Sequence, residues 1–63
     1  QNLDIDGDFV FLYNDNSCKV YDMSGRERFS GEFDFTVSKI TRGSRFNTLI
    51  ITGGDRIREI TLK

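Results

Sequence analysis

The sequence predicts an all-β fold, an antiparallel meander of about seven short strands. Short apolar and β-branched runs alternate with turn clusters, as in the segment from Asn14 to Ser17 between two such runs. The chain has no alanine and shows no sustained helical period, so no helix is expected. The apolar pattern of residues 9–23 returns in residues 48–62, although the aligned letters differ.

Four strands are predicted in the first half of the chain. They are Leu3 to Asp6, Phe9 to Tyr13, Cys18 to Met23 and Arg28 to Phe35. Leu3 and Ile5 alternate with aspartates, which is typical of a strand with one wet face. The run from Phe9 to Tyr13 carries no charge on either face, so we expect it to be covered on both sides.

The last of these strands is expected to lie at an edge. Phe29, Phe33 and Phe35 alternate with charged or small polar residues, so the three rings share one face. They could form a partner-binding stripe, but packing beneath the strand is the stronger expectation.

Three further strands are predicted in the second half. They are Val37 to Thr41, Thr48 to Thr52 and Ile57 to Leu62. A meander of four short strands that repeats near forty residues is typical of a β-propeller blade. Residues 1–35 would then form one four-stranded blade, and residues 36–63 three strands of the next, or about one and a half blades.

Composition limits the stability that the chain can reach alone. At 63 residues it forms at most one small domain. Cys18 is its only cysteine and it has no histidine, so neither an internal disulfide nor the usual zinc sites can form. We therefore expect further stability to come from more chain or from a second copy.

The segment from Lys19 to Arg26, Lys-Val-Tyr-Asp-Met-Ser-Gly-Arg, resembles the third-strand turn of WD40-like and quinoprotein-like β-propellers. The whole chain is similar to the C-terminal blades of uncharacterised membrane-anchored propellers in Gram-positive anaerobic bacteria. This resemblance implies a propeller fold and an extracytoplasmic, cell-surface place, with an anchor outside this chain. The Gly-His and Trp-Asp pairs of WD40 repeats and the tryptophan docking motif of quinoprotein blades are absent, so no ligand chemistry carries over.

Asp4, Asp6 and Asp8 resemble the start of a calcium loop. An EF-hand loop counted from Asp4 would need glycine and glutamate where Phe9 and Asp15 stand, so that interpretation fails. A solvated turn is the better account, with an irregular calcium site as the alternative.

No residue of the sequence is assigned a catalytic, cofactor-binding or metal-binding role. Cys18 has no histidine to activate it and is expected to be a small buried core residue. The carboxylates that could act in pairs are expected to be surface charges. These pairs are Glu27 with Glu32 and Asp22 with Asp34.

Charge is unevenly distributed along the chain. Residues 1–35 carry a net charge of −5 and residues 36–63 a net charge of +4. A basic half can bind single-stranded nucleic acid on a small β-barrel if exposed aromatic side chains lie beside it. The side chains that would do so are Lys39, Arg42, Phe46, Arg45, Arg56, Arg58 and Lys63. Because five of the six phenylalanines lie in the acidic half, nucleic acid is the less favoured partner.

The favoured function is a non-catalytic structural or protein-interaction module, the closing part of a β-propeller. The segment from Ile57 to Leu62 should leave an open edge, because the second blade lacks a fourth strand. In a longer parent we expect an N-terminal strand to pair with it. The isolated chain is expected to dimerise by edge pairing or strand exchange. No cofactor is expected.

Overall fold

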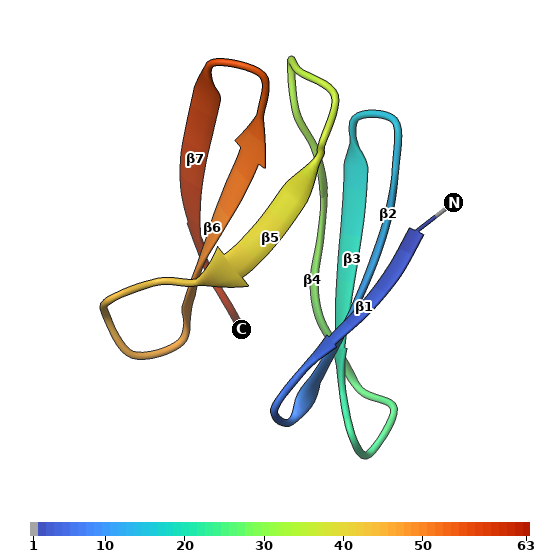
Figure 1. Cartoon of the computed structure of the whole chain (residues 1–63). Coiled ribbons are helices and arrows are strands. Elements are labelled where there is room, and N and C mark those ends of the chain that lie inside the picture. Colours follow the sequence, from blue (N-terminus) through green and yellow to red (C-terminus); the bar gives the residue numbers. More distant parts are fainter. Residues whose placement is uncertain (1) are drawn as a thin grey trace.

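The computed structural model describes residues 2–63, which form seven strands in two antiparallel sheets (Figure 1). Sheet A contains β1 (Asn2–Asp6), β2 (Phe9–Asn14), β3 (Ser17–Asp22) and β4 (Glu27–Glu32). Sheet B contains β5 (Lys39–Arg42), β6 (Thr48–Gly53) and β7 (Arg56–Thr61). The all-β prediction is confirmed. No segment of residues 2–63 forms a helix with the length and apolar character to cross a membrane.

Sheet A is a simple meander with its strands in chain order. Leu3 pairs with Leu12 and Ile5 with Val10, while Phe11 pairs with Val20. The β1–β2 and β2–β3 turns are tight because Gly7 and Asp15 adopt positive φ angles of 59° and 52°. Aspartate tolerates this conformation better than most residues with a side chain.

Sheet B repeats this arrangement with one strand fewer. Leu49 pairs with Arg42 on one side and with Ile60 on the other. When residues 9–23 are aligned with residues 48–62, the bounds of β2 coincide with those of β6, and the bounds of β3 with those of β7. We call residues matched by this alignment counterparts. The counterpart of Asp15 is Gly54, which also has a positive φ, of 60°. The β2–β3 and β6–β7 hairpins therefore share strand lengths and a positive φ at the same turn position.

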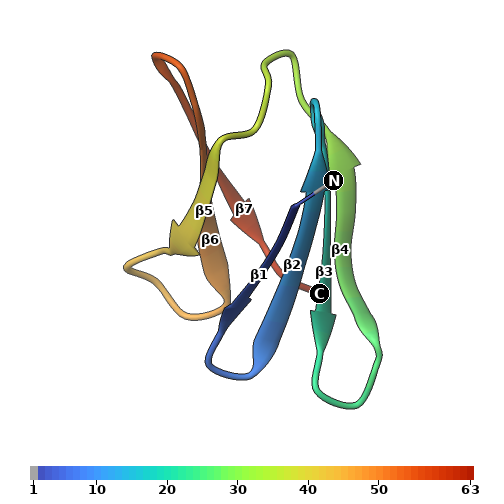
Figure 2. The same ribbon diagram turned by 45° about the vertical axis from the view of Figure 1, so that its right-hand side comes forward.

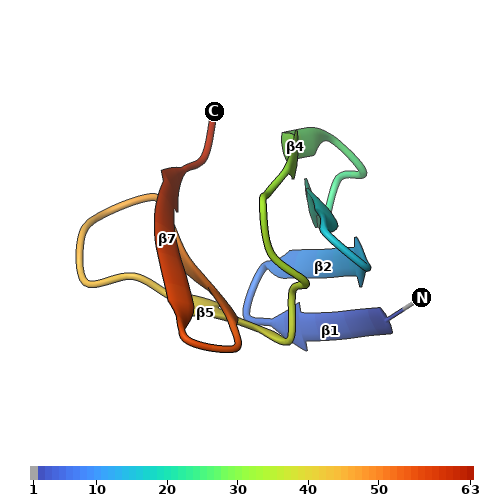
Figure 3. The same cartoon turned by 90° about the horizontal axis from the view of Figure 1, so that it is seen from above.

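The sheets lie face to face and the core is between them. After β4 the chain crosses the top of the molecule to enter β5 (Figure 2). Seen from above, β1 and β5 lie at the bottom of the view, whereas β4 and the C-terminal end of the chain lie at the top (Figure 3). The buried apolar side chains come from both sheets and from the connection between them. They are Phe11, Cys18, Val20, Phe33, Val37, Ile40, Leu49, Ile51 and Leu62.

The predicted strand from Arg28 to Phe35 is too long, because β4 ends at Glu32. Its partner β3 begins at Ser17, which pairs with Glu32, so no ladder position exists for Phe33. The Phe33 amide instead donates to the Asn16 carbonyl at 2.8 Å. Val37, predicted to begin the next strand, lies before β5 and donates its amide to the Asp15 carbonyl at 2.7 Å.

The prediction that β2 is covered on both sides holds for one face only. Phe11 is fully buried beneath sheet B, whereas Val10 and Leu12 on the opposite face are only half-buried. The difference arises because sheet B packs on one side of sheet A and no described segment covers the other. Of the second hairpin, Leu49 and Ile51 are fully buried.

Candidate interaction surfaces

The free edge of β7 is the first surface of the structure that could bind a partner. The strand order of sheet B is β5-β6-β7, and no described strand lies beyond β7. Its counterpart β3 lies inside sheet A, between β2 and β4. A strand at an edge presents unpaired N–H and C=O groups, which favour pairing with another strand. The predicted open edge is present.

The outer face of sheet A, the face turned away from sheet B, is the second surface. Leu3 and Ile5 on β1 are 64% and 61% exposed there. Their cross-strand partners Leu12 and Val10 lie on the same face, because directly opposed residues of an antiparallel pair point the same way. Isolated apolar residues on a surface need no explanation, but four in one patch on two neighbouring strands do.

A cavity of about 400 Å³ lies where the β1–β2 and β5–β6 turns meet. Phe9 and Leu49 form part of its wall, and Phe46, 91% exposed, forms part of its rim. Arg42 reaches over the Phe9 ring, 5.2 Å from the centroid, and pairs with Asp6 at 3.9 Å. Arg45 also lines the cavity.

The basic residues predicted to bind nucleic acid do not gather at one place. Arg42, Arg45 and Phe46 lie by the cavity, whereas Arg56 begins β7 at the opposite end of sheet B. Four of the six cations have carboxylate partners within the chain. These pairs are Arg42 with Asp6, Arg45 with Glu59, Arg56 with Asp34 and Arg58 with Asp34.

The aspartates of the first turn separate in the structure. Asp4 and Asp6 lie on β1, while Asp8 lies in the following turn. A carboxylate oxygen of Asp4 accepts the Ile5 amide at 3.1 Å, and Asp6 faces Arg42. Within residues 2–63, no group of three or more cysteine or carboxylate side chains could hold a metal ion.

Cys18 lies in the core, as predicted, and is 1% exposed. Burial raises the pKa of its thiol to about 11. A thiol with so high a pKa is almost entirely protonated at neutral pH, and the thiolate is the reactive form.

The aromatic stripe also packs as predicted. Phe33 is buried, and its ring stacks on Phe35 at 5.3 Å and on Phe29 at 6.3 Å between centroids. Phe33 also lies beneath the Arg58 guanidinium, 5.9 Å from its ring centroid. The stripe is thus part of the contact between the two sheets.

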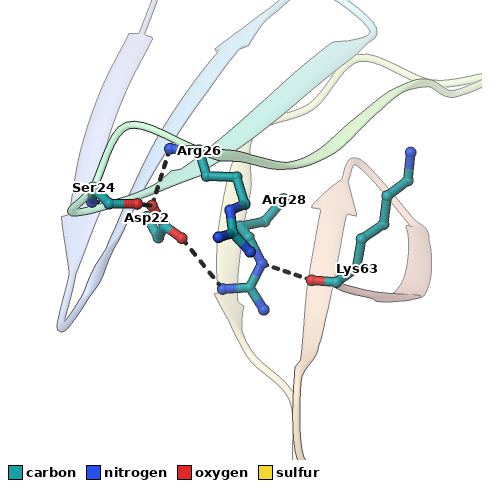
Figure 4. Close-up of polar contacts among 5 residues, drawn as sticks. All are labelled: Asp22, Ser24, Arg26, Arg28 and Lys63. Carbon is teal, nitrogen blue, oxygen red and sulfur yellow. Dashed lines mark hydrogen bonds and ion pairs between the residues drawn. The ribbon is translucent and has the colours of Figure 1, made fainter.

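Asp22 has a structural role that its prediction as a plain surface charge missed. One of its carboxylate oxygens accepts three hydrogen bonds, from the Ser24 hydroxyl at 2.6 Å and from the Ser24 and Arg26 amides at 3.0 Å each (Figure 4). These hydrogen bonds, above all that of the Ser24 hydroxyl, lower the pKa of Asp22. The sequence signal was Asp-Met-Ser-Gly, since an aspartate two residues before a turn serine favours this geometry.

The same close-up shows how the two sheets are joined near the C-terminal end (Figure 4). The Nε of Arg28 on β4 donates to the Lys63 carbonyl at 2.6 Å, and the Lys63 amide donates to the Arg28 carbonyl at 3.0 Å. Arg28 also lies 3.6 Å from the second carboxylate oxygen of Asp22. The β3–β4 turn and the end of the chain are therefore connected through one guanidinium.

Comparison with protein families gives one match. The model of a family of unknown function, DUF5711, matches residues 1–62. The chain belongs to this family. The match spans the strands of both sheets. No curated protein and no solved structure matches the chain.

Proposed function

We propose that this chain is a non-catalytic structural or protein-interaction module, about one and a half blades of a β-propeller, whose open edge accepts a strand from outside. The observation that carries the proposal is the position of β7. It matches β3 in length and in the turn that precedes it, yet among the strands of residues 2–63 β3 has a neighbour on each side and β7 has only one. The missing neighbour would take the place that β4 takes in sheet A.

The stacking of the sheets supports the propeller interpretation. In both sheets the strands follow chain order, and β1 and β5 lie at the same side of the molecule (Figure 3). Propeller blades are four-stranded meanders arranged radially, each packed on the next. The connection from Phe33 to Ser38, which packs Phe33 and Val37 into the core, would be the link between blades.

The experiment supplies the missing strand. Leu62 is the counterpart of Met23, so replacing Lys63 by a copy of residues 24–37 gives sheet B a turn and a fourth strand like β4. We expect the 63-residue chain to self-associate at micromolar concentration through its free edge, and the extended chain to be a more stable monomer. Analytical ultracentrifugation and urea unfolding measure the two properties.

A matched control carries the same extension with proline in place of the residues copied from Phe29 and Gly31. Proline cannot donate to a ladder, so this tail should neither stabilise the chain nor prevent association. An original chain that stays monomeric and gains nothing from the added strand would contradict the proposal. Tight binding of a single-stranded oligonucleotide, weakening steeply with salt in an anisotropy titration, would instead favour the nucleic-acid alternative.

A further inference from the structure

We infer that the outer face of sheet A is a docking surface for another four-stranded antiparallel sheet of the same kind, which lies on it as sheet A lies on sheet B. The inference rests on the proposed function and extends it from the edge of β7 to a different face of the molecule. Corresponding positions of the two sheets carry similar side chains but differ in burial.

The register makes the outer face of sheet A the counterpart of the inner face of sheet B. Leu49 and Ile51, which face sheet A, are the counterparts of Val10 and Leu12. On the first strand, Ile40 pairs with Ile51 as Leu3 pairs with Leu12, so Leu3 corresponds to Ile40. Corresponding faces of the two sheets therefore point in the same direction. As a result, the contact between the sheets joins two faces that do not correspond to each other, the Phe11 face of sheet A and the Leu49 face of sheet B.

Burial differs sharply between these corresponding residues. Ile40 is 4% exposed and Leu3 is 64% exposed. Leu62 is 5% exposed, and its counterpart Met23 is 59% exposed. On the second strands, the two β6 residues that face sheet A are fully buried, and their β2 counterparts are half-buried. At these positions both sheets carry apolar residues, but only in sheet B are they covered. Ile5 is the exception, because it pairs with Val10 as Arg42 pairs with Leu49 and so corresponds to a charged residue.

The orientation of β1 supports the same conclusion. Asp4 and Asp6 pair with Phe11 and Phe9, so they lie on the side of β1 that faces sheet B. Leu3 and Ile5 lie on the opposite side. All residues of β1 except the half-buried Asp6 are exposed, and its apolar side chains lie on the side away from sheet B. Apolar side chains gathered on one side of a strand are ordinarily buried, so the pattern is explained if a partner covers that side.

Charge indicates what the partner carries. Arg58 of sheet B lies over the Phe33 ring of the connection that follows β4, and its Nη2 atom lies 3.8 Å from a carboxylate oxygen of Asp34 in the same connection. Its counterpart on the outer face of sheet A is Lys19, also basic and exposed. The partner sheet is therefore expected to present an apolar centre, as Phe11 and Val20 do, with a carboxylate and an aromatic ring opposite Lys19.

A tandem chain tests this surface. The tandem chain consists of residues 2–38 followed by residues 2–63. Ser38 of the first copy then leads directly into β1 of the second copy, as Ser38 leads into β5 in the original chain. The second unit carries Asn14→Gly, because its counterpart Gly53 lies against Thr36 of the connection and a Cβ there would clash with it. The first unit carries Met23→Leu, so that Met23 of the second unit is the only methionine. The original chain with Asn14→Gly is the reference.

Oxidation by hydrogen peroxide, followed by mass spectrometry, reports on Met23. We expect oxidation to be at least roughly tenfold slower in the tandem chain than in the reference, because the side chain becomes buried. Equal oxidation rates of Met23 in the tandem chain and the reference would overturn the inference. A tandem chain that fails to fold would also leave Met23 exposed and would count in the same way.

Unfolding provides the second measurement. In the reference, where Leu3 is exposed, Leu3→Ser should raise the equilibrium constant of unfolding by no more than about threefold. In the second unit of the tandem chain, the same substitution should raise it by about thirtyfold, because Leu3 is buried there. Ile57→Ser, at a 70% exposed position on the far face of sheet B, should act alike in both chains.

Equal effects of Leu3→Ser in the two chains would overturn the inference. So would a dimer of the original chain that Leu3→Lys dissociates. In a second copy the inner face of sheet A is already covered by its own sheet B, so the outer face would then be binding a different kind of surface. The edge experiment above reports on β7 and can fail without affecting this result.

Discussion

Cys18 shows how a single residue can belong wholly to the core. It has a reactive functional group, but it is buried in the same cluster as Phe11 and Val20 and accounts for part of the contact between the sheets. Its neutral thiol behaves there as a small apolar group. Its elevated pKa is a consequence of this burial and makes the stability of the fold depend on pH.

The first prediction concerns that dependence. Since the pKa of Cys18 is about 11 in the folded state and 9.0 is the ordinary value, its contribution is fully present below pH 9 and is lost as the pH rises through 11. We expect the free energy of unfolding to fall by about 2 to 3 kcal/mol over this range from this group. Urea unfolding at pH 7, 9 and 11 measures it, and Cys18→Val should flatten the decline. An equally steep decline in the valine variant would show that another group is responsible.

Asp22 owes its structural role to the turn that follows it. Its residue type suggested an ordinary surface charge, because a sequence does not show which donors a turn directs at a carboxylate. Once the β3–β4 turn forms, the hydroxyl and amide of Ser24 and the amide of Arg26 converge on one oxygen. The conformation of the turn, set by Gly25 at a φ of 88°, creates the site.

At the scale of the elements, the strands were predictable and their ends were less so. Alternation and turn residues place all seven strands, because both signals are local. The end of β4 depends on where β3 begins, which is a property of the pairing. Phe33 and Phe35 continue the alternation beyond Glu32, so the pattern alone extended the strand too far. The open face of sheet A was missed for a similar reason: an apolar run on both sides of β2 does not say whether a covering sheet is present.

The contact between β4 and the chain end yields the second prediction. Arg28 is 20% exposed and binds the Lys63 carbonyl, Asp22 and the face of the Phe9 ring. Arg28→Met keeps the aliphatic bulk but removes these polar contacts. We expect the free energy of unfolding to fall by about 1 to 2 kcal/mol in chemical denaturation.

Arg26→Met is the matched control for Arg28. Arg26 is exposed and its hydrogen bond to Asp22 comes from the backbone amide, so the change should cost no more than about 0.5 kcal/mol. Equal effects of the two substitutions would show that the guanidinium of Arg28 does not join the sheets.

For the molecule as a whole, the uneven charge of the sequence becomes an attraction between two sheets. Basic sheet B contacts acidic sheet A through Arg42 with Asp6, and contacts the connection after β4 through Arg56 and Arg58 with Asp34. Each of these pairs is partly exposed, so each contributes modestly and is weakened by salt. Together they favour one relative placement of the two sheets.

The third prediction follows from these pairs. The hydrogen bond from Arg56, and the positive charge of both arginines, lower the pKa of Asp34. Its contribution to stability is therefore present above its ordinary value of 3.8 and is lost as the pH falls through the lowered pKa. In acid titrations followed by circular dichroism, Asp34→Asn should reduce stability at pH 7 and flatten the decline below pH 4. Asp8→Asn, at an exposed carboxylate of the β1–β2 turn, should change neither; if it acts like Asp34→Asn, the effect comes from net charge alone.

The contact of unlike faces has one more consequence. An interface between two different faces of the same kind of unit is heterologous, and nothing in such an interface limits how many units can be added. Growth stops only if the rotation from one sheet to the next brings the last unit back to the first, or if a terminal unit is built differently. The angle between sheets A and B therefore determines whether such an array becomes a closed ring or an open fibre.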